Sequence, residues 1–212
     1  MKTLRLLAVI MALTALPVQG QLEFSGGMNL SDLTGALGGT DIEGIGNRAG
    51  MIFGIDLILP MGGMGLNLGT AWSQKGVNDF ITDPVTAEDV AVLLDLRYIE
   101  VPLHIRVPVV STGPVSLNFL LGPTFGFQIG CDVVAGLSAA EDCADFANGP
   151  DFKKTDISGT AGLGISFGLG GILYAGFDVR VTTGMTSISN ISTNSLKNRS
   201  FTAKTHVGFA IF

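Results

Sequence analysis

Eight ionisable residues fall on one face of the alternating segments of this 212-residue chain, and they are its best candidates for chemistry. They are three carboxylates, three cations and two histidines: Asp56, Glu100, His104, Arg106, Asp178, Arg180, Lys204 and His206. The rest of that face is mainly glycine and small polar residues. Such a set could pass protons or small ions, form a hidden acid–base site, or pair internally. Because burying one unpaired charge costs several kcal/mol, the pattern favours an ion-pair network that fills an interior and fixes strand register.

Enzymatic chemistry is not indicated. The sequence has no phosphate-binding Gly-Lys-Ser/Thr loop and no His-Glu-x-x-His metal motif, and the glycines at 162–168 lie in an expected strand, where they leave room for other side chains. The acidic loops lack the spacing of a twelve-residue calcium loop. We therefore predict no catalytic residue, no cofactor and no metal. A lipid-modifying enzyme stays open as a third hypothesis, which His104→Ala or His206→Ala would test.

The last segment of the chain, 200–212, alternates small or polar side chains with apolar ones and ends in phenylalanine. Phe201, Val207 and Phe209 share one face, whereas Lys204 and His206 share the other. A period of two that separates apolar from polar side chains is typical of a strand between lipid and a barrel interior. The carboxyl-terminal residues Phe209, Ile211 and Phe212 are interpreted as the signal that the barrel assembly machinery reads.

Eight segments show this alternation, and their spacing predicts how they connect. They are 22–30, 49–59, 64–73, 94–107, 115–129, 155–167, 172–183 and 200–212. The connections between them are long at 31–48, 74–93, 130–154 and 184–199 and short elsewhere. Short periplasmic turns, long outer loops and an even number of strands are the rule for outer-membrane barrels. The sequence therefore predicts an all-β, eight-stranded antiparallel transmembrane β-barrel, with charges inside and apolar residues towards lipid. A lipocalin-like barrel would have the reverse orientation.

The first twenty residues are expected to be an export signal. Lys2 and Arg5 precede an apolar segment too short to span a bilayer, and small residues precede Gln21. We predict a signal peptide at 1–20 and a mature barrel domain at 21–212, located in the outer membrane of a Gram-negative cell. The signal holds two of the 12 basic residues and none of the 18 acidic ones, so its removal changes the formal charge from −6 to −8. An acidic chain excludes nucleic acid as a partner.

Two local features carry structural predictions. Cys131 and Cys143 lie in the third long loop of an exported chain, so a disulfide is expected, with free thiols or metal ligands as the alternative. Pro102 lies within a strand although proline cannot donate to a ladder, so a bulge or kink is expected there. The bend either eases barrel closure or directs Glu100 towards Arg106 or Arg180.

Several short motifs resemble one known family when taken in order. They are 26–31 (GGMNLS), 72–76 (WSQKG), 98–103 (YIEVPL) and 121–123 (LGP). This series resembles the small outer-membrane β-barrel family that includes PorT-like proteins, and the likeness spans the mature chain. The resemblance implies the barrel fold and no catalytic residues; most of that family has no known function, and PorT is associated with protein secretion. One departure is Ala210, where the family has an aromatic residue two places before the terminal phenylalanine.

The sequence therefore favours a non-enzymatic barrel whose lumen is filled by side chains. Its expected role is in envelope structure, adhesion or partner binding through the extracellular loops. The alternative is a narrow porin-like channel for small ions or solutes. The expected partners are outer-membrane lipid and lipopolysaccharide, the barrel assembly machinery, and an extracellular or periplasmic protein.

Overall fold

The computed structural model describes residues 20–37, 40–82, 89–136, 139–145, 151–191 and 195–211. The expected signal peptide therefore lies outside the described residues except for Gly20, and so does Phe212 of the expected assembly signal. No helix among the described residues is long and apolar enough to cross a membrane.

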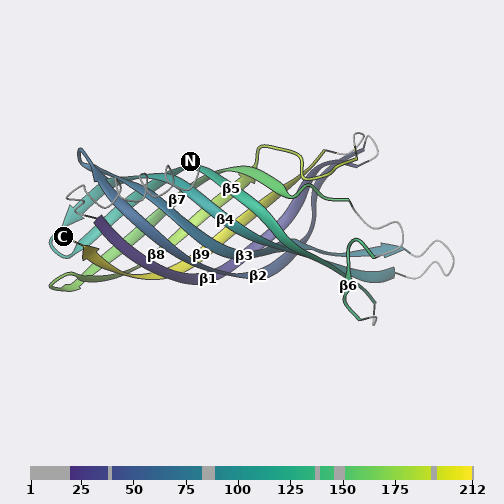
Figure 1. The fold of residues 1–212 in the computed structure, drawn as a ribbon, viewed down its shortest axis with the longest axis horizontal. Coiled ribbons are helices and arrows are strands. Elements are labelled where there is room, and N and C mark those ends of the chain that lie inside the picture. The colour runs from purple at the N-terminus through teal and green to yellow at the C-terminus, as the bar shows by residue number, and fades with distance from the viewer. Residues whose placement is uncertain are drawn as a thin grey trace, which may run out of the picture.

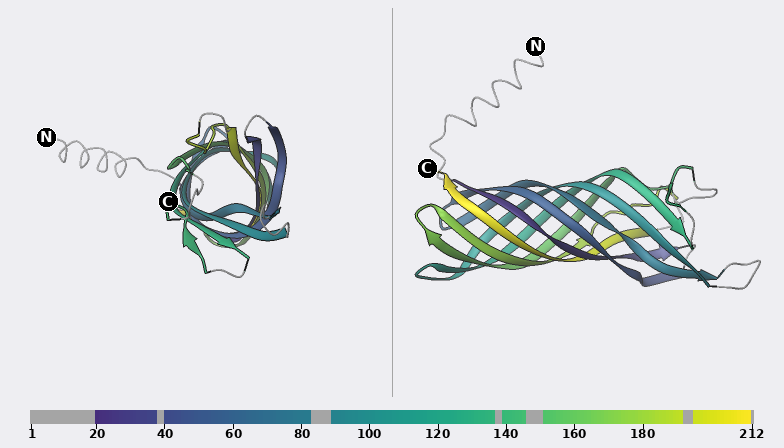
Figure 2. Two further views of the ribbon diagram at one scale, coloured as in Figure 1. Left: turned by 90° about the vertical axis from the view of Figure 1, so that its right-hand side faces the viewer. Right: turned by 90° about the horizontal axis from the view of Figure 1, so that it is seen from below.

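Eight long antiparallel strands form a closed ring, seen end-on in Figure 2. They are β1 (Gly20–Leu37), β2 (Thr40–Met61), β3 (Met64–Thr82), β4 (Asp89–Thr112), β5 (Val115–Ala135), β7 (Thr155–Gly170), β8 (Leu173–Gly184) and β9 (Ser195–Ile211). Each strand pairs with its neighbours in the chain, and β1 pairs with β9 to close the ring. A short strand, β6 (Glu141–Asp142), pairs with the outer end of β5, at the end of the barrel opposite the C-terminus (Figure 1). The predicted fold class is confirmed.

The three short turns lie at the same end of the barrel as Gly20 and Ile211, the first and last described residues. They join Met61 to Met64, Thr112 to Val115, and Gly170 to Leu173. The first turn needs a positive φ at two successive positions, and Gly62 (φ 55°) and Gly63 (φ 90°) supply it. Glycine adopts this conformation without the Cβ clash that other residues meet, so the sequence closes the hairpin tightly here.

Side-chain polarity along β9 shows which face of the barrel meets lipid. Phe201 and Val207 point outwards and are 46% and 45% exposed, whereas Thr202, Lys204 and His206 point inwards and are at most 5% exposed. The same arrangement recurs on the other strands, where phenylalanine, leucine, isoleucine and valine cover the outside. An apolar outside around a polar inside is the pattern of a barrel that crosses a membrane, and it is the reverse of a soluble barrel.

Two of the four segments predicted to be long loops are mainly strand. Most of 31–48 belongs to β1 and β2, and most of 74–93 belongs to β3 and β4. The 24 residues of β4 span about 80 Å along the strand, whereas a membrane crossing needs only about 9–11 residues. The strands therefore continue well beyond a bilayer. Their apolar side chains face inwards there instead of outwards, so the alternation expected of a membrane strand ends and the sequence resembles a loop.

The described residues of 31–51, 74–98, 128–154 and 185–199 form what we call the outer extension. Pairing between β2 and β3 stops at Ile52 and Ser73, and pairing between β5 and β7 stops at Phe127 and Thr155. Beyond these points the ring continues as two sheets, β9–β1–β2 and β3–β4–β5–β6. Figure 1 shows this part projecting from the end that carries β6.

The predicted bulge at Pro102 is also wrong. Pro102 is buried, and the register of β4 against β5 is the same at Pro102 and at Ile105. Only the hydrogen-bonded pairing between β4 and β5 is interrupted, at Leu103 and His104. Proline lacks an N–H and so removes one hydrogen bond, but this loss does not require the extra residue that makes a bulge. The register instead shifts between Arg97 and Tyr98. As a result the inward face of β5 changes from even to odd positions, and Cys131 points into the interior.

Candidate functional site

The barrel interior is the candidate functional site, and its lower part is organised around Glu23. Arg106 donates to both carboxylate oxygens of Glu23, at 2.7 and 3.0 Å. The Tyr174 hydroxyl donates to the same carboxylate at 3.1 Å, and His206 Nε2 lies 3.6 Å from it. Glu23 is 1% exposed, so this bidentate pair is shielded from water. Strands β1, β4, β8 and β9 are thereby held together across the lumen.

Two further ion pairs complete this lower layer. Arg180 Nη2 lies 2.8 Å from Asp178 Oδ2, and Lys204 Nζ lies 3.0 Å from Asp56 Oδ2. His206 Nδ1 lies 3.7 Å from Asp178. All five of these residues are at most 6% exposed.

A second layer lies nearer the outer end, and its pairing was not predicted from the sequence. Lys75 Nζ lies 2.5 Å from Glu100 Oε1 and 5.5 Å from the centre of the Tyr98 ring. Glu100 therefore pairs with neither of the arginines that the sequence suggested as its partners. Asn198 donates to the Tyr98 hydroxyl at 3.2 Å and to Asp156 at 2.9 Å, which links this pair to β7 and β9.

The layered interior comes close to charge balance. Among the described residues, these two layers and His104 hold five carboxylates, four cations and two histidines: Glu23, Asp56, Glu100, Asp156, Asp178, Lys75, Arg106, Arg180, Lys204, His104 and His206. Glu23, Lys75 and Asp156 were not among the eight ionisable residues singled out from the sequence, although the alternation along 155–167 places Asp156 on the inward face. Glu23 and Asp156 lie on expected strands, where the alternation of inward and outward positions could have identified them as inward-facing. Lys75 lies in the segment 74–93, which was predicted to be a loop.

His104 belongs to a chain of hydroxyl groups rather than to an ion pair. Its Nε2 lies 2.9 Å from the Thr124 hydroxyl, which lies 2.9 Å from that of Thr160, which in turn lies 3.0 Å from that of Thr182. This row crosses β4, β5, β7 and β8 at one level. It gives the three buried threonine hydroxyls and His104 Nε2 hydrogen-bond partners, whereas His104 Nδ1 has no partner among the described residues.

Residues 164–168 match the letters Gly-x-Ser-x-Gly, a motif that the sequence reasoning overlooked. Ser166 Oγ lies 3.4 Å from His206 Nε2, and His206 Nδ1 lies 3.7 Å from Asp178. In hydrolases this motif forms a sharp turn between a strand and a helix, whereas here it lies within the continuous strand β7. Because 3.7 Å is too long for a hydrogen bond between His206 Nδ1 and Asp178, no short Ser–His–Asp relay is formed.

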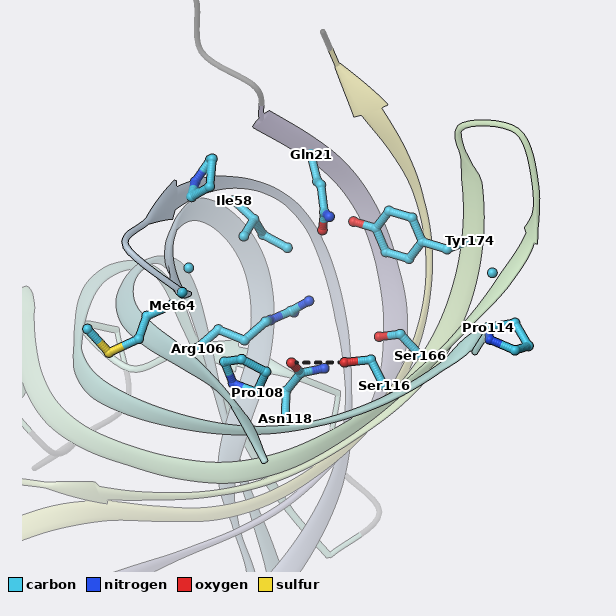
Figure 3. Close-up of a pocket in the computed structure, with 14 residues that line it drawn as sticks. Gln21, Ile58, Met64, Arg106, Pro108, Pro114, Ser116, Asn118, Ser166 and Tyr174 are labelled. Atoms are coloured by element: carbon cyan, nitrogen blue, oxygen red, sulfur yellow. Dashed lines mark hydrogen bonds between the residues drawn. The ribbon is translucent and has the colours of Figure 1, made fainter. Parts of the chain in front are cut away.

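A cavity of about 480 Å³ opens at the end of the barrel with the short turns (Figure 3). Gln21, Tyr174 and Asn118 contribute polar groups to it, and the side chain of Arg106 forms its inner part. A separate void of about 30 Å³ lies beside His104 in the middle of the lumen. That volume corresponds to about one water molecule.

An apolar cluster closes the other end of the lumen, inside the outer extension. We call it the outer core, and it consists of Leu33, Val77, Leu94, Leu96, Tyr98, Cys131, Val133, Cys143, Phe152, Ile188 and Leu196. Leu96, Tyr98 and Ile188 have no exposed surface. We call the remaining described residues, 20–30, 52–73, 99–127, 155–184 and 200–211, the membrane zone. Polarity in the outer extension is inverted relative to the membrane zone, with apolar side chains inside, as in a soluble domain.

The two cysteines form a disulfide within the outer core. Cys131 and Cys143 have Cα atoms 5.5 Å apart, and each residue is 7% exposed. The sulfurs are therefore buried against the outer core, whereas the sequence suggested a bridge within an exposed loop. No group of three or more histidine, cysteine or acidic residues in the described part of the chain could hold a metal ion.

Comparison with known proteins identifies the family. The family model described as outer membrane protein beta-barrel domain matches residues 19–190. The chain belongs to this family. It is thus a small outer-membrane β-barrel protein, and the family resemblance expected from its motifs is confirmed at this level. No curated protein matches the sequence.

Solved structures of other small barrels are similar to this chain. Neisserial surface protein A is 9% identical, with a TM-score of 0.51, and the match covers 91% of this chain and 97% of that one. Ail of Yersinia pestis, solved with the heparin analogue sucrose octasulfate, is 15% identical over 90% of this chain and 99% of its own, with a TM-score of 0.43. OprG of Pseudomonas aeruginosa is 11% identical over 91% of this chain and 96% of its own, with a TM-score of 0.35. The first of these similarities supports the fold alone.

Proposed function

We propose that this protein is a non-conducting, non-enzymatic membrane anchor that holds the outer extension rigidly at the cell surface for adhesion, partner binding or envelope integrity. The observation that carries the proposal is that two different sets of side chains fill the lumen. Paired charges fill the membrane zone, and the outer core fills the lumen above it. A channel needs neither filling, whereas a platform that must keep its shape benefits from both.

The energetic logic of the two fillings differs by environment. Within the bilayer the outside is already apolar, so the inside gains nothing from apolar side chains and ion pairs can fix the strand register instead. Above the bilayer the wall faces water on its outside, so the hydrophobic effect can stabilise an apolar interior. The disulfide between Cys131 and Cys143 adds to the rigidity of that part.

Planar-bilayer recording tests the sealed lumen. The purified mature protein, with its insertion verified by heat-modifiable migration on gels, is expected to give no conductance steps. The double variant Glu23→Ser with Arg106→Ser enlarges the cavity at the turn end only, so it should also stay silent. Steady conductance from the wild-type protein would contradict the proposal.

A narrow pore for small ions or solutes is the second candidate, and the 480 Å³ cavity favours it. This cavity admits solutes from the periplasmic end as far as Arg106. If it continued as a water path, the double variant should conduct better than the wild type. Silence from both proteins would reject the pore.

The binding role has its own test. Cells carrying the wild-type chain are compared with cells carrying Cys131→Ser with Cys143→Ser, which loosens the outer extension and leaves the membrane zone unchanged. Attachment to other cells or to protein-coated surfaces should fall in the variant at equal surface amounts. Equal attachment by cells carrying the wild-type chain and by cells lacking it would argue against a binding role. Phe209 and Ile211, both exposed on β9, remain our proposed contacts for the assembly machinery.

A further inference from the structure

The basic residues of the protein are distributed unevenly around the barrel. From Gly20 onwards the chain has ten lysines and arginines, all within the described residues, and five of them are buried: Arg48, Lys75, Arg106, Arg180 and Lys204. The other five are half-buried or exposed: Arg97, Lys153, Lys154, Lys197 and Arg199. Of these, Arg97 is on β4 and pairs with Asp132, whereas the remaining four lie on β9 and on the segment before β7. One side of the outer surface therefore carries four of the five accessible cations, together with the carboxylates of Asp151, which accepts from Asn190, and Asp32, which pairs with Arg199.

Backbone contacts bring these four residues to the same region. The Lys153 N–H donates to the Ile188 carbonyl, and the Ile188 N–H donates to the Leu196 carbonyl. Lys197 follows Leu196 directly. The segment before β7 therefore lies beside the segment after β8 and the start of β9.

The level of these cations coincides with the edge of the membrane zone. The outward-facing positions of β9 run from Ser195, Lys197 and Arg199 to Phe201 and then stay small or apolar. Basic side chains that follow an apolar band lie where the headgroups of a bilayer begin. Because the short turns face the periplasm, this edge belongs to the outer leaflet.

An apolar groove of about 410 Å³ begins at the same place, on the outside of β5, β7 and β8. Gly122, Pro123, Gly159 and Ala161 line it with little side-chain volume, and Leu121 and Met185 lie beside them.

The groove and the cations are directly connected. Thr183, which lines the groove, is the ladder partner of Arg199. Lys197 lies against Gly184, next to Met185, which in turn lies beside Gly159. The Arg199 side chain is 50% exposed, although it also pairs with Asp32.

We propose that this surface binds a phosphorylated, multiply acylated glycolipid of the outer leaflet, the lipid A class. Lys153, Lys197 and Arg199 would hold its phosphate groups, and one acyl chain would occupy the groove below them. Four separated cations suit a lipid with more than one phosphate better than a lipid with a single phosphate. The groove faces hydrocarbon, so an acyl chain is the occupant that its surroundings supply. The proposal does not depend on whether the lumen is sealed.

Lipid retention measured by native mass spectrometry tests the proposal. The mature protein in detergent is titrated with bis-phosphorylated lipid A. Each cation beside an anionic membrane contributes about fivefold in binding, so Lys153→Gln with Lys197→Gln should retain this lipid roughly 30-fold more weakly. Gly159→Leu fills the groove and should weaken retention without changing any charge. The substituted residues of both variants face outwards, and heat-modifiable migration of each variant on gels verifies that it is folded.

Matched controls separate this site from general attraction. Arg97→Gln removes an outward cation on another side, and Ala203→Leu enlarges a small outward residue away from the groove; neither should change retention of lipid A. Dephosphorylated lipid A should bind the wild type as weakly as the lysine variant binds the intact lipid. Equal retention by the wild type and both site variants would overturn the proposal. So would equal loss in Arg97→Gln, or retention of phosphatidylglycerol as strong as that of lipid A.

Discussion

Replacing Lys204 with methionine will leave a buried carboxylate without its partner. Lys204 Nζ lies 3.0 Å from Asp56 Oδ2, and the two side chains are 4% and 3% exposed. Gly27 and Gly69 adjoin them so closely that an added Cβ would collide with Lys204 and Asp56 respectively. A void of about 30 Å³, which both side chains line, has room for about one water molecule. One water molecule cannot replace the lost charge, so the carboxylate must stay unpaired, take up a proton or open the barrel.

The expected cost is about 3–5 kcal/mol, the usual penalty for removing one partner of a buried pair. With a urea dependence of about 2 kcal/mol per M, the midpoint of unfolding should fall by about 2 M. The double variant Asp56→Asn with Lys204→Met removes both charges at similar volume, and it should recover most of the loss. Unfolding in lipid vesicles, followed by heat-modifiable migration, measures both midpoints.

A matched control is Val207→Met, which places the same side chain on the lipid-facing side of β9, where 45% of Val207 is exposed. It should change the free energy of unfolding by less than about 0.5 kcal/mol. The reasoning is refuted if Lys204→Met is as stable as this control, or if the double variant is no more stable than Lys204→Met.

Four further expectations follow from the other parts of the barrel. Cys131→Ser should destabilise the outer extension by about 3 kcal/mol on the loop-closure estimate, seen as faster proteolysis of 136–151 with unchanged protection of the membrane zone. Leu96→Ala, at a fully buried site of the outer core, should cost about 2–5 kcal/mol, measured by thermal unfolding. Gly164→Val should reduce the folded yield sharply, because its Cβ would collide with a carboxylate oxygen of Asp178, whereas Ala161→Val on the outside should fold normally. Ser166 should not react with a fluorophosphonate, and covalent labelling of that residue would contradict the absence of catalysis.

The membrane zone could be predicted because lipid imposes a strict period of two. All eight strands occur where the alternation placed them, and the eight ionisable residues marked by parity are buried in the interior. Their pairing could not be predicted, because partners such as Glu23 and Arg106 are 83 residues apart and meet only through the ring closure. Alternation fixes the face of a side chain, whereas register and barrel closure decide its neighbour.

The outer extension was missed for a physical reason. In the membrane zone apolar means outside, but Leu94, Leu96 and Val77 are apolar and inside. A strand that crosses the membrane edge therefore inverts its pattern partway, and the inversion resembles the end of a strand. The bulge near Tyr98 adds a further change of parity on β5. Long strands with inverted outer ends can be recognised in a sequence once this possibility is considered.

Cysteine accessibility along β9 tests the central claim most directly. Single cysteines replace Lys197, Phe201 or Thr202 in intact cells, with the native disulfide kept. The account predicts that a small membrane-impermeant maleimide labels Lys197→Cys, that only a hydrophobic reagent labels Phe201→Cys, and that neither reagent labels Thr202→Cys until the barrel unfolds. Labelling of Thr202→Cys in the folded protein by the water-soluble reagent would show an open lumen, and labelling of Phe201→Cys by that reagent would show that this face does not meet lipid.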